Sequence, residues 1–145
     1  MTSKRHVVCD GNGIPLAVHL ADGRAHDLTQ AKAVLEKVRV PRRRGRPRSR
    51  PDGLAADKGY DSDAFRRYLR RRGIRHSIPQ RRNRKPRRGR PPVVHPELSG
   101  RRWVVERLFR AFDGFRRLMV RHERLAIVHL GMLQLAAIMI TLRHF

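Results

Sequence analysis

The chain has 145 residues, one cysteine and a formal net charge of +23, from 35 lysines and arginines against 12 acidic residues. A field of this size makes a polyanion the natural ligand, and nucleic acid is the first candidate. One cysteine excludes an internal disulfide and a cysteine zinc site, and residues 1–6 lack the apolar core of a secretion signal. We therefore expect a protein of a reducing cytoplasm, with Cys9 as a buried thiol.

A β-hairpin is predicted first. The apolar runs 5–10 and 14–20 flank Asp10-Gly-Asn-Gly13, whose residues tolerate the left-handed backbone of a tight turn. A helix should follow from Asp27, its predicted N-cap, to Val38. Its apolar face consists of Ala31, Val34, Leu35 and Val38.

Further strands and helices alternate along the middle of the chain. Residues 53–57 form a short apolar run that predicts a strand, and residues 62–72 predict an amphipathic helix ended by Gly73. Residues 74–79 can form another strand. Alternation of this kind predicts an α/β fold, a sheet covered by helices.

Two basic segments interrupt this pattern, at residues 39–51 and 80–92. Each contains seven cations and three prolines, so like-charge repulsion and proline favour extended, solvated loops. Such loops can contact DNA or can simply be solvated linkers. The candidate DNA-binding residues in them are Arg42, Arg43, Arg44, Arg81, Arg82, Arg84, Lys85, Arg87, Arg88 and Arg90.

A third helical block is predicted from residue 96 to residue 121. Its apolar stripe comprises Val104, Leu108, Ala111, Phe112, Phe115, Leu118 and Met119, and its opposite face carries Arg102, Glu106, Arg110, Asp113 and Arg117. Glu106 therefore points away from the core. One interpretation is a solvated glutamate in salt bridges to Arg102 and Arg110.

The last apolar segment, residues 125–142, predicts a helix buried against the sheet or a partner chain. A membrane span is the lesser alternative, because His129, Gly131 and Gln134 interrupt the segment. His129 and Gln134 should then be satisfied core or interface residues.

Two carboxylates stand out on this basic chain. Asp57 follows Leu54-Ala-Ala and precedes Lys58-Gly-Tyr60, and Glu106 lies within Arg101-Arg-Trp-Val-Val-Glu-Arg107. Carboxylates flanked by apolar runs and cations are typical of metal ligands in a site that acts on phosphate.

Taken together, these motifs resemble the C-terminal part of the catalytic domain of bacterial insertion-sequence DDE transposases, in the superfamily of insertion sequences four and five. The resemblance extends over almost the whole chain. It is carried by residues 4–8, 10–18, 23–27, 57–62, 81–92, 105–109 and 115–118.

This resemblance implies an RNase H-like mixed sheet flanked by helices, in which three acidic residues bind two Mg²⁺ ions, for which Mn²⁺ can substitute. Asp57 matches the second family aspartate and Glu106 the family glutamate. Arg102 matches the arginine of the Tyr-Arg-Glu-Lys signature, a DNA contact. Ser99 and Asp113 stand where that signature has tyrosine and lysine.

The first family aspartate and its strand should lie upstream of Met1. The expectation is a partial catalytic domain over residues 1–145, truncated at its N-terminus and inactive alone, that performs DNA strand cleavage and transfer once an upstream segment is supplied. Asp10 is a lesser candidate for the missing ligand, since it lies in the hairpin turn.

The expected partners are double-stranded DNA, as element ends and target, together with the upstream segment or further copies of the chain, at the bacterial nucleoid and not at a membrane. One alternative is a noncatalytic DNA-binding remnant that inhibits the full-length transposase. Another, a basic RNA-binding protein of the ribosomal type, leaves the Asp57 and Glu106 motifs unexplained.

Overall fold

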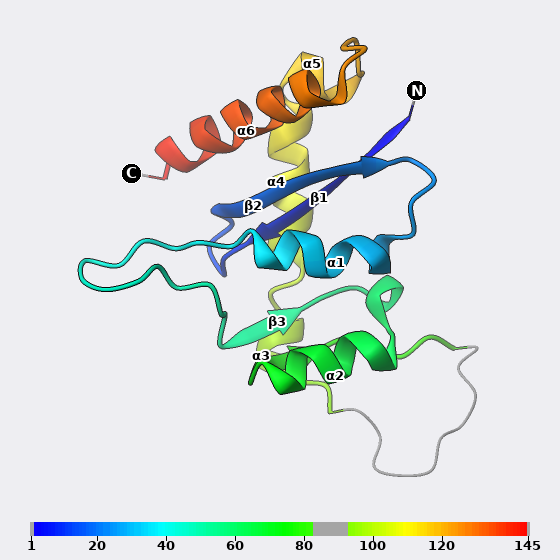
Figure 1. Cartoon of the computed structure of the whole chain (residues 1–145), viewed down its shortest axis with the longest axis vertical. Coiled ribbons are helices and arrows are strands. Elements are labelled where there is room, and N and C mark those ends of the chain that lie inside the picture. The colour runs from blue at the N-terminus through cyan, green and yellow to red at the C-terminus, as the bar shows by residue number, and fades with distance from the viewer. Residues whose placement is uncertain (1, 83–92, 145) are drawn as a thin grey trace. The chain divides into compact units, whose positions relative to one another are not determined.

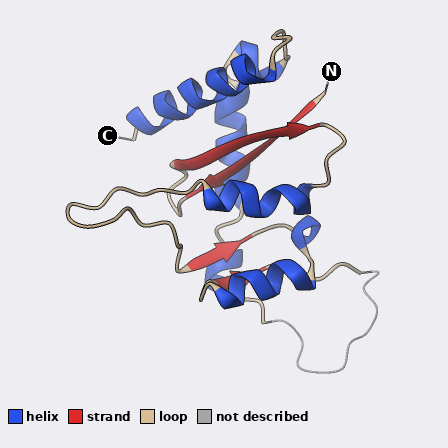
Figure 2. Ribbon diagram, in the orientation of Figure 1, coloured by secondary structure: helices blue, strands red, loops and turns tan. Residues whose placement is uncertain are grey.

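A computed structural model describes residues 2–82 and 93–144 of the chain. Helices and short strands alternate, so the predicted mixed α/β class is confirmed (Figures 1 and 2). The chain forms two compact units. The first unit comprises Met1–Ser49 and Trp103–Phe145, and the second comprises Arg50–Arg102.

The first unit begins with the predicted hairpin. Strands β1 (Ser3–Cys9) and β2 (Pro15–Asp22) are antiparallel, with Val7 opposite Val18. The connecting turn is held by Asp10, whose Oδ1 accepts the backbone N–H groups of Asn12 and Ile14, both at 2.9 Å. Gly13 completes the turn with φ +98°, a conformation that side chains disfavour.

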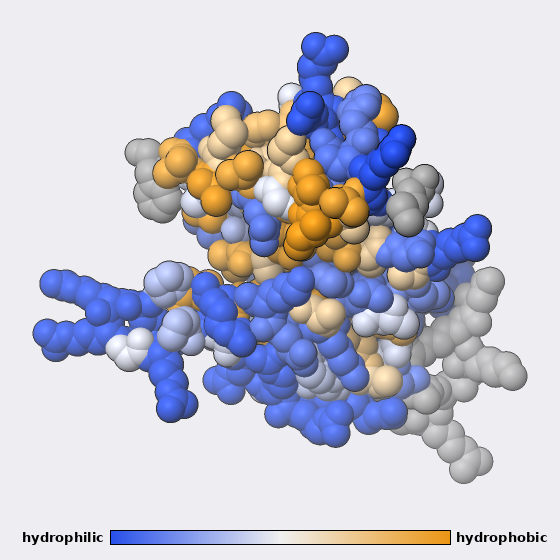
Figure 3. All heavy atoms as spheres, turned by 45° about the horizontal axis from the view of Figure 1, so that its top comes forward, coloured by the Kyte–Doolittle hydropathy of each residue, from blue (hydrophilic) through white to orange (hydrophobic). Residues whose placement is uncertain are grey.

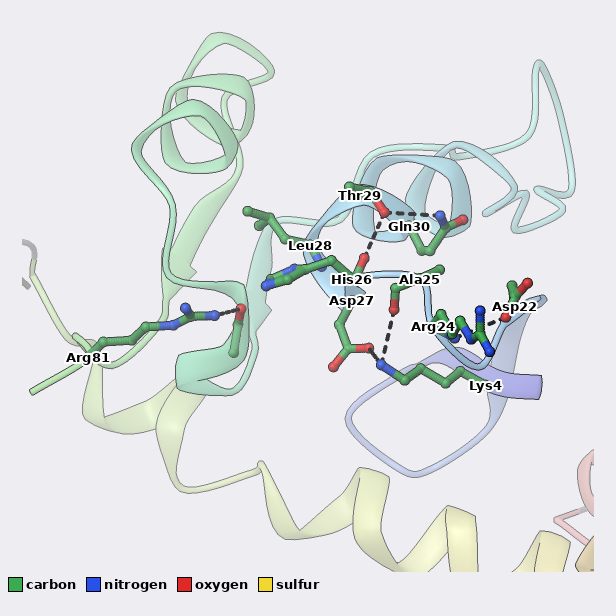
Figure 4. Close-up of polar contacts among 11 residues, drawn as sticks. Lys4, Asp22, Arg24, Ala25, His26, Asp27, Leu28, Thr29, Gln30 and Arg81 are labelled. Atoms are coloured by element: carbon green, nitrogen blue, oxygen red, sulfur yellow. Dashed lines mark hydrogen bonds and ion pairs between the residues drawn. The ribbon is translucent and has the colours of Figure 1, made fainter. Parts of the chain in front are cut away.

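Helix α1 (Asp27–Glu36) packs on both strands of this hairpin. Ala31, Val34, Leu35 and Val38 are buried, which confirms the predicted apolar face. The predicted N-cap is wrong, because His26 is the cap and its Nδ1 accepts the N–H of Leu28 at 3.3 Å. Asp27 is the first helical residue, and its carboxylate pairs with Lys4 Nζ at 3.1 Å (Figure 4).

The predicted single helix over residues 96–121 is also wrong. Three helices occupy this range: α3 (Pro96–Ser99) in the second unit, and α4 (Trp103–Asp113) and α5 (Arg116–Met119) in the first. Gly100 caps the end of α3, and Phe115, with φ −90° and ψ 104°, interrupts the helix after Gly114. The predicted apolar stripe, from Val104 to Met119, crosses Gly114, but glycine is unfavourable inside a helix.

The core of the first unit lies where α4, α5 and α6 (Ala126–Leu142) meet. It consists of Leu108, Phe112, Leu118, Leu133, Ala136 and Ile140, with Val7, Cys9 and Val18 of the hairpin against it. Cys9 was predicted to be buried and is half-buried, and this burial raises the pKa of its thiol to about 11. Two members of the predicted stripe, Ala111 and Met119, are exposed.

Within the described residues, one face of helix α6 is buried and the other is exposed. His129, Leu133, Ala136 and Ile140 are buried, and His129 Nδ1 lies 3.4 Å from Glu123 Oε2. Gln134 is exposed, so it is not a core residue. The other face exposes Ile127, Val128, Leu135, Ile138, Met139 and Leu142, and Figure 3 shows apolar side chains gathered over the helices of this unit. No helix among the described residues has the length and apolarity of a membrane span.

The second unit is built on two short parallel strands, β3 (Gly53–Ala55) and β4 (Arg75–Ser77), both shorter than predicted. Helix α2 (Asp63–Arg71) packs on β4, and Gly73, whose φ is +65°, follows its C-cap Arg72. Phe65, Leu69, Ile74 and Ile78 form the apolar core. Helix α3 lies so close to β3 that a Cβ on Gly53 would come within 2.8 Å of Leu98.

Candidate functional site

Asp57 lies two residues beyond the end of β3, at the start of a single 3₁₀ turn, η1 (Lys58–Tyr60). Its Oδ1 accepts the backbone N–H of Lys58 at 2.7 Å and also accepts Nη2 of Arg102 at 3.0 Å. The side chain is 60% exposed, so the carboxylate faces solvent. Oδ2 makes no hydrogen bond within the described residues and can bind a further ligand.

A buried ion pair lies beneath this turn. Asp61 accepts two bonds from Arg66, at 3.1 Å from Nε and 3.0 Å from Nη2, and the two side chains are 1% and 3% exposed. Arg66 Nη2 also donates to the carbonyl of Ile78 at 2.7 Å, which ties α2 to the chain after β4. Arg66 Nη1 is buried without a hydrogen-bond partner in the described part of the chain.

Arg81 closes the turn from the outside. Its backbone N–H donates to Asp61 Oδ2 at 3.0 Å, and its guanidinium donates to the carbonyls of Lys58 and Gly59 at 3.2 and 2.8 Å. The predicted DNA contact Arg81 is thus also a clamp on the turn that carries Asp57. One sequence signal points to this network: Asp61, the last residue of the motif Asp57-Lys-Gly-Tyr-Asp61. No role was predicted for Asp61 from the sequence.

Arg102, which matches the family signature, and Ser99, which stands where that signature has tyrosine, both lie in the second unit. Arg102 pairs with Asp57, as described above, and Ser99 Oγ lies 2.6 Å from Oγ of the buried Ser77. Ser99 therefore fastens α3 to β4. A tyrosine in its place would have to displace this contact, so the departure from the signature has a local structural reason.

Glu106 occupies the first turn of α4, on the face opposite the buried Val104, Leu108 and Phe112. A carboxylate in this position is favoured by the helix dipole. The side chain is exposed, and no residue of its own helix forms an ion pair with it in the described structure. The alternative salt bridge to Arg110 is therefore not formed, and the carboxylate is available to a ligand.

Contacts with the hairpin hold α4 in place around Glu106. Arg107 Nη2 donates to the carbonyl of Asn12 at 2.8 Å, and its guanidinium lies 4.9 Å from the Trp103 ring centroid. Arg5 Nη2 pairs with Asp113 at 2.8 Å. Asp113, which stands where the signature has lysine, thus anchors the helix.

Carboxylate oxygens are the donors that Mg²⁺ prefers, so Asp57 and Glu106 fit such an ion in chemical type. Each lies in a different compact unit. Across residues 2–82 and 93–144, no three His, Cys, Asp or Glu side chains are grouped closely enough to hold a metal ion. Asp10 holds its own turn, which agrees with its assignment as a turn residue.

The basic candidates divide into three sets. Arg42, Arg43 and Arg44 are exposed within residues 39–51, and Arg81 and Arg82 are exposed at the start of the second basic segment. Arg84, Lys85, Arg87, Arg88 and Arg90 lie outside the described residues. The first segment is not wholly extended, because Val40 and Arg48 form an isolated antiparallel bridge.

Comparison with known proteins gives a consistent result. Residues 1–142 match the model of the transposase DDE domain family. The chain is 40% identical over 140 residues to a Burkholderia cepacia protein named as a transposase for insertion sequence element IS402; the match covers 95% of this chain and 62% of that protein. It is 27% identical over 143 residues to a Brucella ovis protein named as a transposase for insertion sequence element IS6501, covering 99% of this chain and 100% of that protein.

No solved structure matches the chain. It spans somewhat less than two thirds of the Burkholderia relative and the whole length of the Brucella relative. The family match extends over nearly the entire sequence and includes both carboxylate motifs. The chain therefore belongs to the transposase DDE domain family.

Proposed function

We propose that this chain is the Mg²⁺-binding portion of an insertion-sequence transposase that cleaves and transfers DNA strands at element ends. The observation that carries the proposal is the solvent-facing carboxylate of Asp57, fixed on a capped turn at the end of a strand and paired with Arg102. Glu106, on the exposed face of α4, is the second ligand.

An RNase H-like sheet is the proposed frame for these ligands. Among the described residues, β1 pairs only with β2, and β3 pairs only with β4. Each two-stranded sheet therefore offers an edge at which a further strand can pair. We propose that an upstream segment supplies this strand together with the first aspartate.

The ligands explain the proposed chemistry. A bound Mg²⁺ or Mn²⁺ ion would lower the pKa of the attacking water or 3′-hydroxyl and neutralise the leaving oxygen. Arg102 donates to Asp57 Oδ1 and so leaves Oδ2 for the ion. The arginines of residues 39–51 and 80–92 would neutralise DNA phosphates, which positions the duplex.

The proposed partners follow from the same features. They are double-stranded DNA, as element ends and as target, and either the upstream segment or a second copy of the chain. The net charge of +23 supports the DNA partner. The proposed location is the bacterial cytoplasm, at the nucleoid.

The test uses the reconstituted protein, meaning this chain joined to an upstream segment that carries the first aspartate. Asp57→Asn and Glu106→Gln should each reduce cleavage of labelled element ends with Mg²⁺ or Mn²⁺ by at least about 10³-fold, since a lost ligand disturbs the in-line geometry. Gel-shift affinity for the same duplex should stay within about twofold, because phosphate contacts are unchanged.

Glu97→Gln is the matched control, since Glu97 is an exposed carboxylate of the second unit, 3.9 Å from Arg75. It should leave cleavage unchanged. Cleavage that survives both Asp57→Asn and Glu106→Gln would refute the ligand assignment.

A noncatalytic DNA-binding remnant is the second candidate. It is favoured by the absence of any three-residue metal group among the described residues. In that case the reconstituted protein would bind element ends without cleaving them, and the chain would inhibit a full-length transposase when the two are mixed.

A further inference from the structure

The first basic segment contains an ordered, closed tip. The N–H of Val40 donates to the carbonyl of Arg48 at 2.9 Å, and the N–H of Arg48 donates back to Val40 at 2.8 Å. These two bonds bring the ends of residues 41–47 together, and this range is called the basic tip below. Figure 1 shows it as part of the long loop that follows α1.

Four arginines and one glycine dominate the basic tip. Arg42, Arg43, Arg44 and Arg46 are exposed, as are all other residues of the range, and the tip contains no acidic side chain. Within the described residues these four arginines form no hydrogen bond or ion pair. Their guanidinium groups are therefore available to an external anion.

Gly45 lies between two of these arginines. Its φ of +84° is a conformation that other residues rarely adopt, and a Cβ placed there would meet no atom within 4 Å. Gly45 has no side chain to shield the backbone between Arg44 and Arg46, so a flat surface can approach this backbone closely. Pro41 and Pro47 stiffen the two ends of the tip.

We propose that the basic tip inserts into the minor groove of A·T-rich DNA, with Arg44 and Arg46 as the side chains that read it. The inference rests on the proposed function in that DNA is the partner, and it adds which groove and which sequences are recognised. The minor groove is about 6 Å wide, which suits a narrow chain segment better than a helix. In A-tracts it is narrower and more negative, and arginine is favoured there.

Two other modes of DNA contact fit less well. The tip has no aromatic side chain, so it lacks the stacking surface that single-strand binding uses. Arginine contact with guanine in the major groove is the stronger competitor.

The same four residues, Arg-Gly-Arg-Pro, occur at 44–47 and again at 88–91 in the sequence, each time inside a basic segment.

Inosine separates the two grooves. An I·C pair lacks the guanine amino group of the minor groove and keeps the guanine acceptors of the major groove. Competition binding of the chain, without metal, to A·T, I·C and G·C duplexes of equal length should rank A·T and I·C together, about tenfold tighter than G·C, the size of one poorly matched base pair.

The charge-preserving double variant Arg44→Lys, Arg46→Lys should reduce this preference to about twofold or less. Lysine keeps the charge, but its ammonium is more strongly hydrated than a guanidinium and is costlier to bring into the groove. The matched control is Arg67→Lys with Arg116→Lys, two exposed arginines of α2 and α5. The control should keep the full preference.

Equal affinity for all three duplexes would overturn the proposal, and a ranking of G·C and I·C above A·T would assign the tip to the major groove. Neither result affects end cleavage that depends on Asp57 and Glu106, so failure of this inference is distinct from failure of the proposed function. Conversely, the protein could prefer A·T duplexes and yet retain cleavage in both Asp57→Asn and Glu106→Gln. That result would refute the proposed function and leave the minor-groove inference intact.

Discussion

The two compact units hold their proposed metal ligands by different means. In the first unit, Glu106 lies on a helix whose opposite face is buried in an apolar core around Phe112. In the second, Asp57 lies on a turn fixed by the buried Asp61–Arg66 pair. Apolar packing tolerates some change of shape, whereas a buried charge that loses its partner is strongly destabilising.

The largest expected effect on stability comes from the buried pair. Arg66→Ala in the reconstituted protein should lower the free energy of unfolding of the second unit by about 3–5 kcal/mol, because it removes the guanidinium that donates two hydrogen bonds to the buried Asp61 carboxylate. Hydrogen exchange resolved along the chain should report the loss in residues 53–78 first.

The double variant Arg66→Met, Asp61→Leu sharpens this prediction. Removing both charges should recover most of the stability, since a hydrophobic replacement of a buried ion pair is often neutral. Cleavage should nevertheless remain impaired, because Asp61 also accepts the N–H of Arg81, which clamps the turn. Full cleavage by the double variant would mean that the network does not position Asp57.

A similar but more local loss is expected in the first unit. Phe112 is fully buried, and Phe112→Ala should cost about 3–5 kcal/mol, reduced to the extent that the core collapses around the cavity. Amide hydrogen exchange should become faster in α4 and α6 and change little in α2. Equal increases in both units would show that the units do not have separate cores.

The smallest expected effect is a pH dependence in the first unit. The pKa of Glu123 is lowered, chiefly by its own backbone N–H and also by His129 and Arg117. A carboxyl whose folded pKa is depressed contributes stability that is present above its unfolded pKa, ordinarily 4.5, and lost as the pH falls through the folded value.

Glu123→Gln should therefore reduce the pH dependence of the stability of the first unit between about pH 5 and pH 3, as measured by thermal unfolding. His122 is an exposed neighbour, and His122→Gln serves as the control that keeps the wild-type slope. A slope unchanged in Glu123→Gln would assign the pH dependence to another carboxyl.

Local patterns in the sequence predicted much of the fold. The hairpin, α1, α2 and the strands near residues 53 and 75 follow from turn residues and apolar spacing, and all are present. The break at Gly114 was missed because the apolar stripe from Val104 to Met119 runs on through that glycine. The N-cap was assigned to Asp27, whose carboxylate is instead engaged by Lys4 from a distant strand.

The residues that support the site were harder to predict. Helical spacing puts Arg66 on the same side of α2 as the buried Leu69 and puts Arg67 on the opposite side, but the charge of Arg66 argued against its burial. Its burial depends on Asp61 and on the carbonyl of Ile78, which only tertiary structure brings together. The bridge between Val40 and Arg48 was not predicted either, because the charge and prolines of residues 39–51 favoured an extended loop.

The central proposal is that Asp57 and Glu106 are ligands of one metal site. A double-variant cycle on Mn²⁺ affinity, measured by electron paramagnetic resonance on the reconstituted protein, tests this most directly. If the carboxylates share the site, Asp57→Asn and Glu106→Gln should each weaken binding by at least about tenfold, and the double variant should be far less impaired than the product of the two losses. Losses that multiply, or affinity unchanged in either single variant, would contradict a shared site.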